Sequence, residues 1–240
     1  MADAANDAAT GRARVMAAMR RALGVTGDEP ERRAAVAARL SGHARHLVPR
    51  RAAVSGAERL DLFRRMAEAT QTTVAEVDTA ADVPSAVADY LRTNNLPARI
   101  RRGADPVLAT MPWHEVSALE VTEGPARADD LASLSHAFAA VAETGTLILT
   151  SGPDNPTTLN FLPDNHIVVV EASRVVGAYE DAWDRLRAAY GEAAMPRTVN
   201  MITGPSRTAD IEQTIQLGAH GPRRLHVILV RNGGPSSATA

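Results

Sequence analysis

The sequence contains no cysteine and no lysine, so all 26 basic residues are arginines. Without cysteine, the chain cannot form disulfides, use a thiol nucleophile or supply thiolates to zinc or to an iron-sulfur cluster. Without lysine, it cannot form a Schiff base, attach pyridoxal phosphate or carry a Walker lysine. Codon usage in a GC-rich genome explains the arginine bias most simply, and these exclusions do not depend on its cause.

Long hydrophobic runs are also missing, because the apolar segments at residues 146–149, 167–170 and 227–230 have only the length of strands. The first ten residues show neither a basic nor an apolar leader region. We therefore expect no membrane span and a cytoplasmic protein. With 240 residues, 45% of them hydrophobic, the chain can bury the core of one domain with a small appendage.

Charge is distributed unevenly along the chain. Residues 1–65 contain 13 arginines and 7 acidic residues, whereas the remainder contains 13 arginines and 21 acidic residues. A solvated helical surface is the first interpretation of this asymmetry, and a docking arm for an acidic partner is the second. Nucleic acid ranks third, because the arginines are not interleaved with aromatic residues and the whole chain has a net charge of −2.

Strands and helices are expected to alternate, which predicts a mostly parallel sheet with helices on both faces. Residues 1–50 should form an N-terminal helical extension, residues 51–231 the α/β domain and residues 232–240 a disordered tail. The expected helices cover residues 10–24, 30–40, 179–190, a segment from Ser55, a segment from Asp82 and a short segment from Ser135 to 143. The expected strands cover residues 73–77, 96–100, 119–122, 131–134, 146–150 and 166–170.

The stretch from residue 201 to residue 230 resembles one β–α–β unit, with a Gly-Pro-Ser-Arg-Thr loop before its helix. A glycine at a helix N-terminus lets backbone amides approach an anion, and Arg207 would add positive charge there. The loop is expected at the carboxyl ends of the strands, where open α/β sheets bind ligands. His220 and Arg223 would then lie about 15 Å away, at the other end of a ten-residue helix.

The connection between residues 150 and 165 contains prolines and no convincing helix, so an antiparallel return is expected. That arrangement would bring Glu143 beside Arg207. Glu143 is then the candidate for acid/base or acyl-carrying chemistry, although a structural ion pair with Arg207 is an equally good interpretation. The other residues expected to bind a small carboxylate or phosphate are Thr144, Gly145, Thr203, Gly204, Ser206, Arg207, Thr208 and Asp210.

The seven histidines are scattered and give no metal signal, and His166 and His226 should be buried structural residues. His220 is interpreted as a turn residue. No Gly-x-Gly-x-x-Gly dinucleotide fingerprint follows any expected strand.

Four strings occur in an order that resembles a known family: AETGT at 142–146, Leu-Pro before the HIVVV strand at 166–170, GPSRTADIE at 204–212 and GAHGPR at 218–223. Together they look like the LUD domain of the lactate utilization protein C (LutC/YkgG) family, over about residues 60–230. The resemblance implies a three-layer α/β/α sandwich of the NagB/RpiA/CoA-transferase class. It also implies a role in oxidising L-lactate to pyruvate, with iron-sulfur clusters on companion subunits.

Two functions are therefore open. The first is a non-redox subunit or accessory protein of L-lactate utilization, with iron-sulfur partner subunits and no covalently bound cofactor. The second, drawn from fold analogy, is a stand-alone transferase or hydrolase that acts on a CoA ester or a sugar phosphate.

Overall fold

The computed structural model describes residues 2–191, 194–209 and 214–232, and residues 1–46 and 47–240 form two separate compact units. The first unit contains helices α1 (Ala2–Leu23) and α2 (Pro30–Gly42). Pro30 opens α2 at a position where a missing N–H costs no hydrogen bond. Both N-terminal helices were expected from the sequence, whereas the expected disordered tail falls almost entirely outside the described residues.

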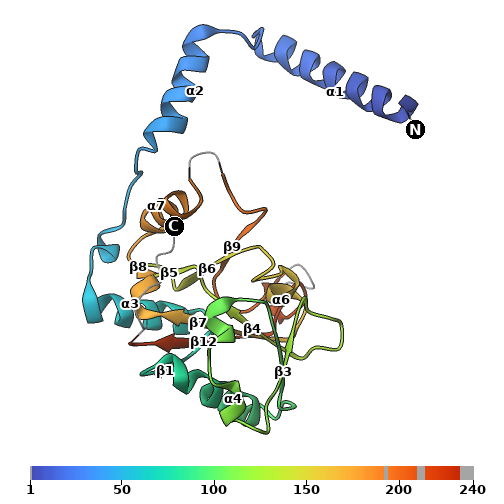
Figure 1. The fold of residues 1–240 in the computed structure, drawn as a ribbon. Coiled ribbons are helices and arrows are strands. Elements are labelled where there is room, and N and C mark those ends of the chain that lie inside the picture. The colour runs from blue at the N-terminus through green and yellow to red at the C-terminus, as the bar shows by residue number, and fades with distance from the viewer. Residues whose placement is uncertain (1, 192–193, 210–213, 233–240) are drawn as a thin grey trace. The chain divides into compact units, whose positions relative to one another are not determined.

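Six parallel strands form the main sheet of the second unit, in the order β1-β12-β7-β4-β2-β3 (Figure 1). Their bounds are β1 (Thr73–Val77), β2 (Arg99–Arg102), β3 (Glu120–Glu123), β4 (Ala132–His136), β7 (Asn165–Glu171) and β12 (Arg224–Val230). The central strands β7 and β12 are almost wholly buried and read as continuous apolar runs, as parallel strands covered on both faces do. The predicted α/β fold with a mostly parallel central sheet is confirmed.

A second sheet of four strands, in the order β8-β5-β6-β9, packs against one face of the main sheet. Its strands are β5 (Ala139–Val141), β6 (Thr146–Thr150), β8 (Val175–Val176) and β9 (Val199–Ile202). Strand β6 is antiparallel to both β5 and β9. The antiparallel return expected between residues 146–150 and the strand at residues 166–170 is therefore wrong, because β6 and β7 belong to different sheets and β6 pairs with β5 and β9 instead.

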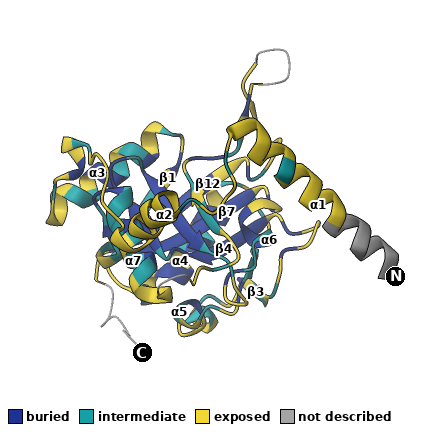
Figure 2. Ribbon diagram, turned by 90° about the horizontal axis from the view of Figure 1, so that it is seen from above, coloured by how far each residue is buried: buried dark blue, intermediate teal, exposed yellow. Residues whose placement is uncertain are grey.

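Helices cover the outer faces of these layers. Their bounds are α3 (Gly56–Ala69), α4 (Val83–Thr93), α5 (Pro106–Ala109), α6 (Thr158–Phe161) and α7 (Tyr179–Tyr190), with 3-10 turns at Arg50–Ala52, Ala80–Asp82, Trp113–Glu115 and Ala172–Arg174. Helix α4 packs on one face of the main sheet, and α3 packs with the second sheet on the other. Helix α7 covers the outer face of the second sheet. Figure 2 shows the sheet strands as the buried centre between these helices.

The helix expected from Ser135 is wrong, because residues 132–141 form strands β4 and β5 instead. Ala137, Ala139 and Ala140 favour a helix by intrinsic propensity, but all three are completely buried. Packing between the two sheets therefore overrides local preference in this alanine-rich segment.

The β–α–β unit expected at residues 201–230 is also wrong. Strands β9 and β12 belong to different sheets, and between them lies an antiparallel hairpin of β10 (Arg207–Thr208) and β11 (Gln216–Leu217). Asp210 lies outside the described residues. The corner that begins at Gly204 sits beside Thr70, which precedes β1, and beside Pro222, which precedes β12. It therefore lies at the amino ends of the main-sheet strands, not at their carboxyl ends.

Candidate functional site

Strands β2 and β4 are neighbours whose outgoing connections leave in opposite directions along the sheet. The chain passes from β2 outward to β3, and from β4 inward to β7. In open α/β sheets, a crevice forms at the carboxyl ends of two such strands, and ligands bind there. The residues that follow β2, end β4 and end β7 are therefore the first place to look for a site.

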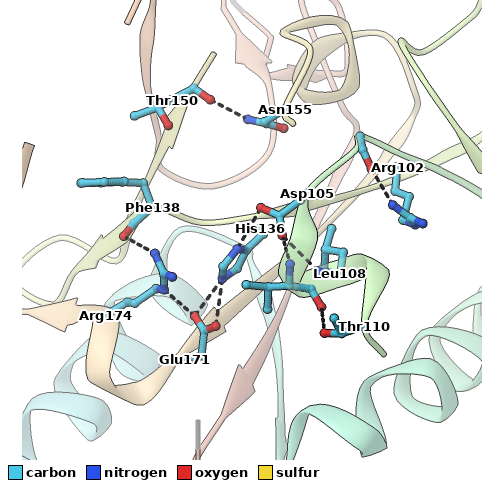
Figure 3. A network of polar contacts seen from close by, with 12 residues as sticks. Arg102, Asp105, Leu108, Thr110, His136, Phe138, Thr150, Asn155, Glu171 and Arg174 are labelled. Carbon is cyan, nitrogen blue, oxygen red and sulfur yellow. Dashed lines mark hydrogen bonds and ion pairs between the residues drawn. The ribbon is translucent and has the colours of Figure 1, made fainter. Parts of the chain in front are cut away.

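Four charged residues meet at this position, and we call Asp105, His136, Glu171 and Arg174 the charged cluster (Figure 3). His136 Nδ1 lies 3.1 Å from Asp105 Oδ2, and His136 Nε2 lies 2.9 Å from Glu171 Oε2. Arg174 Nε lies 2.8 Å from the same Glu171 oxygen. An ordered chain of alternating charges therefore crosses the carboxyl ends of β2, β4 and β7.

Local sequence fixes each member of the charged cluster. Asp105 precedes Pro106 and caps α5, where its Oδ1 accepts hydrogen bonds from the N–H groups of Val107 and Leu108 at 2.8 and 3.1 Å. His136 and Glu171 are the last residues of β4 and β7. Arg174 ends the 3-10 turn that follows β7, so it stands three residues from Glu171 and can return to it.

The electrostatics of the cluster make His136 a cation at neutral pH. Burial alone would lower the pKa of His136, but the hydrogen bonds and charges of Asp105 and Glu171 outweigh it and raise the pKa to about 8. Burial raises the pKa of both carboxyl groups, yet the interactions with His136 leave the pKa of Asp105 and of Glu171 below the ordinary values. Because both ring nitrogens donate to carboxylates, the imidazolium holds two carboxylates ionised and has no free nitrogen with which to act as a base.

A cavity of about 250 Å³ opens beside the charged cluster. It is lined by Asp105, Val107, His136, Phe138, Thr150, Ser151, Gly152, Asp154, Asn155, Arg174 and Tyr190. Its volume lies just under the roughly 300–1,000 Å³ of pockets that take drug-sized ligands, so it suits a small metabolite. Within the described residues, no three His, Asp or Glu side chains are arranged to hold a metal ion.

Four of the residues predicted from the sequence, Thr144, Gly145, Thr203 and Gly204, converge at a different place, where Thr146 joins them. We call these five residues the glycine corner. Thr146 Oγ1 lies 2.7 Å from Thr144 Oγ1 and 2.6 Å from Thr203 Oγ1. The hydroxyl of Tyr179 lies 2.7 Å from Thr146 Oγ1. The antiparallel pairing of β6 and β9 causes this meeting, because the start of β6 stands opposite the end of β9.

Both glycines of the corner have left-handed backbones and touch α3 or the residue after it. A Cβ atom on Gly145, whose φ is +69°, would stand 2.4 Å from the Ala67 nitrogen. A Cβ atom on Gly204, whose φ is +74°, would stand 2.4 Å from the Thr70 carbonyl oxygen. Each position therefore needs glycine for both its conformation and its space.

Glu143 is buried, and its Oε1 accepts a hydrogen bond of 3.1 Å from the Tyr179 N–H at the start of α7. A carboxylate at this position also faces the positive end of the helix dipole. Arg207 is exposed, and no ion pair between it and Glu143 is found in the described part of the chain. The expected structural pairing of these two residues is therefore not observed.

Ser206 and His220 meet, although the sequence placed them about 15 Å apart. The His220 N–H donates to Ser206 Oγ at 3.2 Å, and the Ser206 N–H donates to the Pro222 carbonyl at 2.9 Å. The hairpin of β10 and β11 returns the chain to its starting point, which a helix would not do. Thr208 is buried within this hairpin.

Comparison with known protein families identifies the class of protein. A family model described as the LUD domain matches residues 60–230, and the chain belongs to this family. A crystal structure of a DUF162 family protein from Deinococcus radiodurans has the same fold, with a TM-score of 0.57 at 28% identity over 74% of this chain and 99% of that one.

Among individual proteins, the chain is similar to lactate utilization protein C of Deinococcus radiodurans, with 33% identity over 159 residues that cover 63% of this chain and 70% of that protein. Lactate utilization protein C of Bacillus subtilis is 37% identical over 91 residues, which cover 38% of each chain. An uncharacterized protein of Neisseria meningitidis is 38% identical over 99 residues, which cover 41% of this chain and 42% of that protein. The aligned regions thus span less than half of the last two relatives.

Proposed function

We propose that this protein takes part in lactate utilization and binds a small α-hydroxy or α-keto carboxylate at the charged cluster. Membership in the LUD domain family and similarity to proteins named lactate utilization protein C support the metabolic role. The observation that carries the site is the buried chain of charges at the carboxyl ends of β2, β4 and β7.

The chemistry of the cluster fits such a ligand. Arg174 is partly exposed, with 31% of its side chain accessible, and its guanidinium can take the ligand carboxylate. Asp105 is an ionised acceptor at the cavity wall, so it can accept the hydrogen of an α-hydroxyl group. A three-carbon hydroxy acid carries both groups on adjacent atoms and is small enough for the cavity.

Oxidation of the ligand would require an electron acceptor, and this chain has no cysteine to hold an iron-sulfur cluster. We therefore place the clusters on companion subunits and assign this chain a binding or positioning role beside them. No helix in the described residues is both long and apolar enough to cross a membrane.

The test is calorimetric titration of the purified chain with L-lactate and with pyruvate. We expect Arg174→Ala to lower the affinity about tenfold or more, because one charge-assisted hydrogen bond contributes about 1.5–3 kcal/mol. Arg187→Ala is the matched control, since Arg187 also pairs with a carboxylate three residues earlier, Asp184, but does not line the cavity. Equal affinity of Arg174→Ala and the parent would overturn the assignment.

The glycine corner stays as a second proposed anion site, with Glu143 as its acid/base group. The meeting of Thr144, Gly145, Thr203 and Gly204 supports it, whereas the bond from Glu143 to α7 draws the carboxylate away from Arg207. Arg207→Ala separates the two proposals: loss of lactate or phosphate binding in this variant alone would assign the anion to the corner. Turnover of a CoA ester or a sugar phosphate by the isolated chain would favour the transferase or hydrolase alternative.

A further inference from the structure

A second, larger cavity of about 1190 Å³ lies at the opposite edge of the main sheet, between α4 and the edge strand β1. Thr73, Ala75 and Val77, alternate residues of β1, line one wall. The opposite wall consists of two rows of α4 residues at helical spacing, Ser85, Asp89 and Thr93 in one and Ala86, Tyr90 and Asn94 in the other. The charged cluster contributes no residue to this cavity.

The outer edge of β1 is free to pair. Within the described residues, β1 pairs only with β12, and the Val77 carbonyl accepts a hydrogen bond from Arg231 on that side. In a parallel ladder, alternate residues point their backbone groups to the same side, so Val74 and Glu76 direct theirs away from β12. Among the residues that the structure describes, none makes a further hydrogen bond to these backbone groups of Val74 or Glu76.

The flank of α4 beside this edge is built of small and polar side chains, including Ser85, Ala86 and Thr93, whereas Val83 and Val87 face the core. Helix α4 contacts both β1 and β12. Its axis therefore lies over the boundary between these two strands, about half a strand spacing inside β1.

The unpaired charges at the two ends of this edge have opposite signs. Arg223 and Arg224 lie at the Thr73 end, and no carboxylate pairs with either in the described part of the chain. Asp164 lines the same end, which leaves one net positive charge there. Asp78 and Asp82 lie at the Val77 end, and Asp82 is bound by Thr79 but by no cation within the residues described.

We propose that two copies of this chain join edge to edge through β1, antiparallel and with a two-fold axis at Ala75, to form one continuous sheet. Val74 of one copy then exchanges backbone hydrogen bonds with Glu76 of the second copy, and the reverse pair forms across the axis. The same operation places the Arg223 and Arg224 end of each copy opposite the Asp78 and Asp82 end of the other. A patch that is complementary to itself in this way is what a two-fold interface requires.

The spacing of the helices agrees with this arrangement. Neighbouring strands are about 4.8 Å apart, so two α4 axes, each half a strand spacing inside its own edge, would stand about 10 Å apart. The axes of packed helices stand about 8–10 Å apart, so the two α4 flanks would contact each other and cover the two cavities. The small side chains on that flank permit such an approach.

The test is the mass of the full chain in solution, by sedimentation or light scattering at the highest soluble concentration. We expect twice the chain mass of 25.4 kDa. The variant Val74→Pro removes an outward N–H that the ladder to β12 does not use, and we expect it to run at the chain mass. Circular dichroism checks that each variant is folded.

Charge reversal makes the test specific for the second copy. We expect Arg223→Glu/Arg224→Glu and Asp82→Arg each to run at the chain mass. An equal mixture of the two should run at twice that mass, because among the variant pairs only the mixed one restores opposite charges at both ends. Arg187→Glu on α7 is the control and should keep the parent mass. A parent at the chain mass, a dimer unaffected by Val74→Pro, or a mixture that does not associate would each overturn the proposal.

Discussion

His136 Nε2 lies 2.9 Å from Glu171 Oε2, at the buried ends of two neighbouring parallel strands. The side chain of His136 is 5% exposed and that of Glu171 is 15% exposed, so water screens this pair weakly. Since Asp105 holds the other ring nitrogen, the protonation of a single imidazole decides whether the two carboxylates have a cation between them.

Stability should fall as pH rises above neutrality. The pKa of His136 is about 8 in the folded protein and 6.5 ordinarily, so its contribution is complete below pH 6.5 and is lost as pH rises through about 8. The difference corresponds to about 2 kcal/mol. Urea denaturation at a series of pH values from 6 to 9 measures this loss, and a flat profile would contradict the pairing seen here.

Acid should destabilise the protein through two other histidines. Burial lowers the pKa of His166 to about 3 and that of His226 to about 4, so both stay neutral in the folded state. The free energy of unfolding is therefore unaffected by these histidines above pH 6.5. As pH falls below 6.5, it decreases by about 1.4 kcal/mol per histidine for each pH unit, until the folded-state pKa is reached. His226→Gln, compared with the parent between pH 4 and 6.5, should reduce the acid slope, and an unchanged slope would refute this assignment.

Replacing His136 by glutamine should be costly at pH 7. The variant leaves Asp105 and Glu171 partly buried and facing each other without the cation, and loss of one partner from a buried ionic group typically costs about 3–5 kcal/mol. The alkaline loss of stability should disappear at the same time. His114→Gln is the control, because His114 is exposed and its replacement should change the free energy of unfolding by less than about 0.5 kcal/mol.

Gly145→Ala should destabilise the protein by about 3 kcal/mol. A left-handed backbone costs an L-residue about 1–2 kcal/mol, and the new Cβ would add a steric conflict of similar size with Ala67. Gly152→Ala serves for comparison, since its Cβ would meet nothing closer than 4.0 Å. The melting temperature of Gly145→Ala should be clearly lower than that of Gly152→Ala. Equal melting temperatures would show that α3 shifts to make room for the new Cβ.

Thr146→Val tests the hydroxyl cluster of the glycine corner. Valine keeps the shape of threonine but leaves the hydroxyls of Thr203 and Tyr179 without a shared partner, at a cost of about 1–3 kcal/mol. Thr110→Val removes an exposed hydroxyl and should cost less. A stability for Thr146→Val equal to that of the parent would mean that the remaining hydroxyls satisfy one another.

Much of the fold can be read from the sequence where pattern and packing agree. Strand β1 and helix α7 occur at the predicted bounds, because a β-prone run in one and helical spacing of apolar residues in the other favour these structures. The segment of residues 132–141 could not be read in this way, since its alanines favour a helix and only contact with two sheets makes it a pair of strands.

The candidate site was likewise predicted from the sequence only in part. Thr144, Gly145, Thr203 and Gly204 were predicted to share one corner, and the structure brings them together. The charged cluster was missed, because His136 stands 31 residues from Asp105 and 35 from Glu171 and only the strand order makes them neighbours. Two local signals were available: an aspartate before a proline after β2, and a glutamate that ends an apolar strand.

Strand β6 joins the two places where a ligand is proposed. Thr146 at its start belongs to the glycine corner, and Thr150 at its end lines the cavity of the charged cluster, about 14 Å away by the rise of an extended chain. Its middle residues are wholly buried between two partners, and a slip by one residue would turn each of them to the wrong face. The pairing of β6 on both sides therefore fixes the distance and the register between the two places.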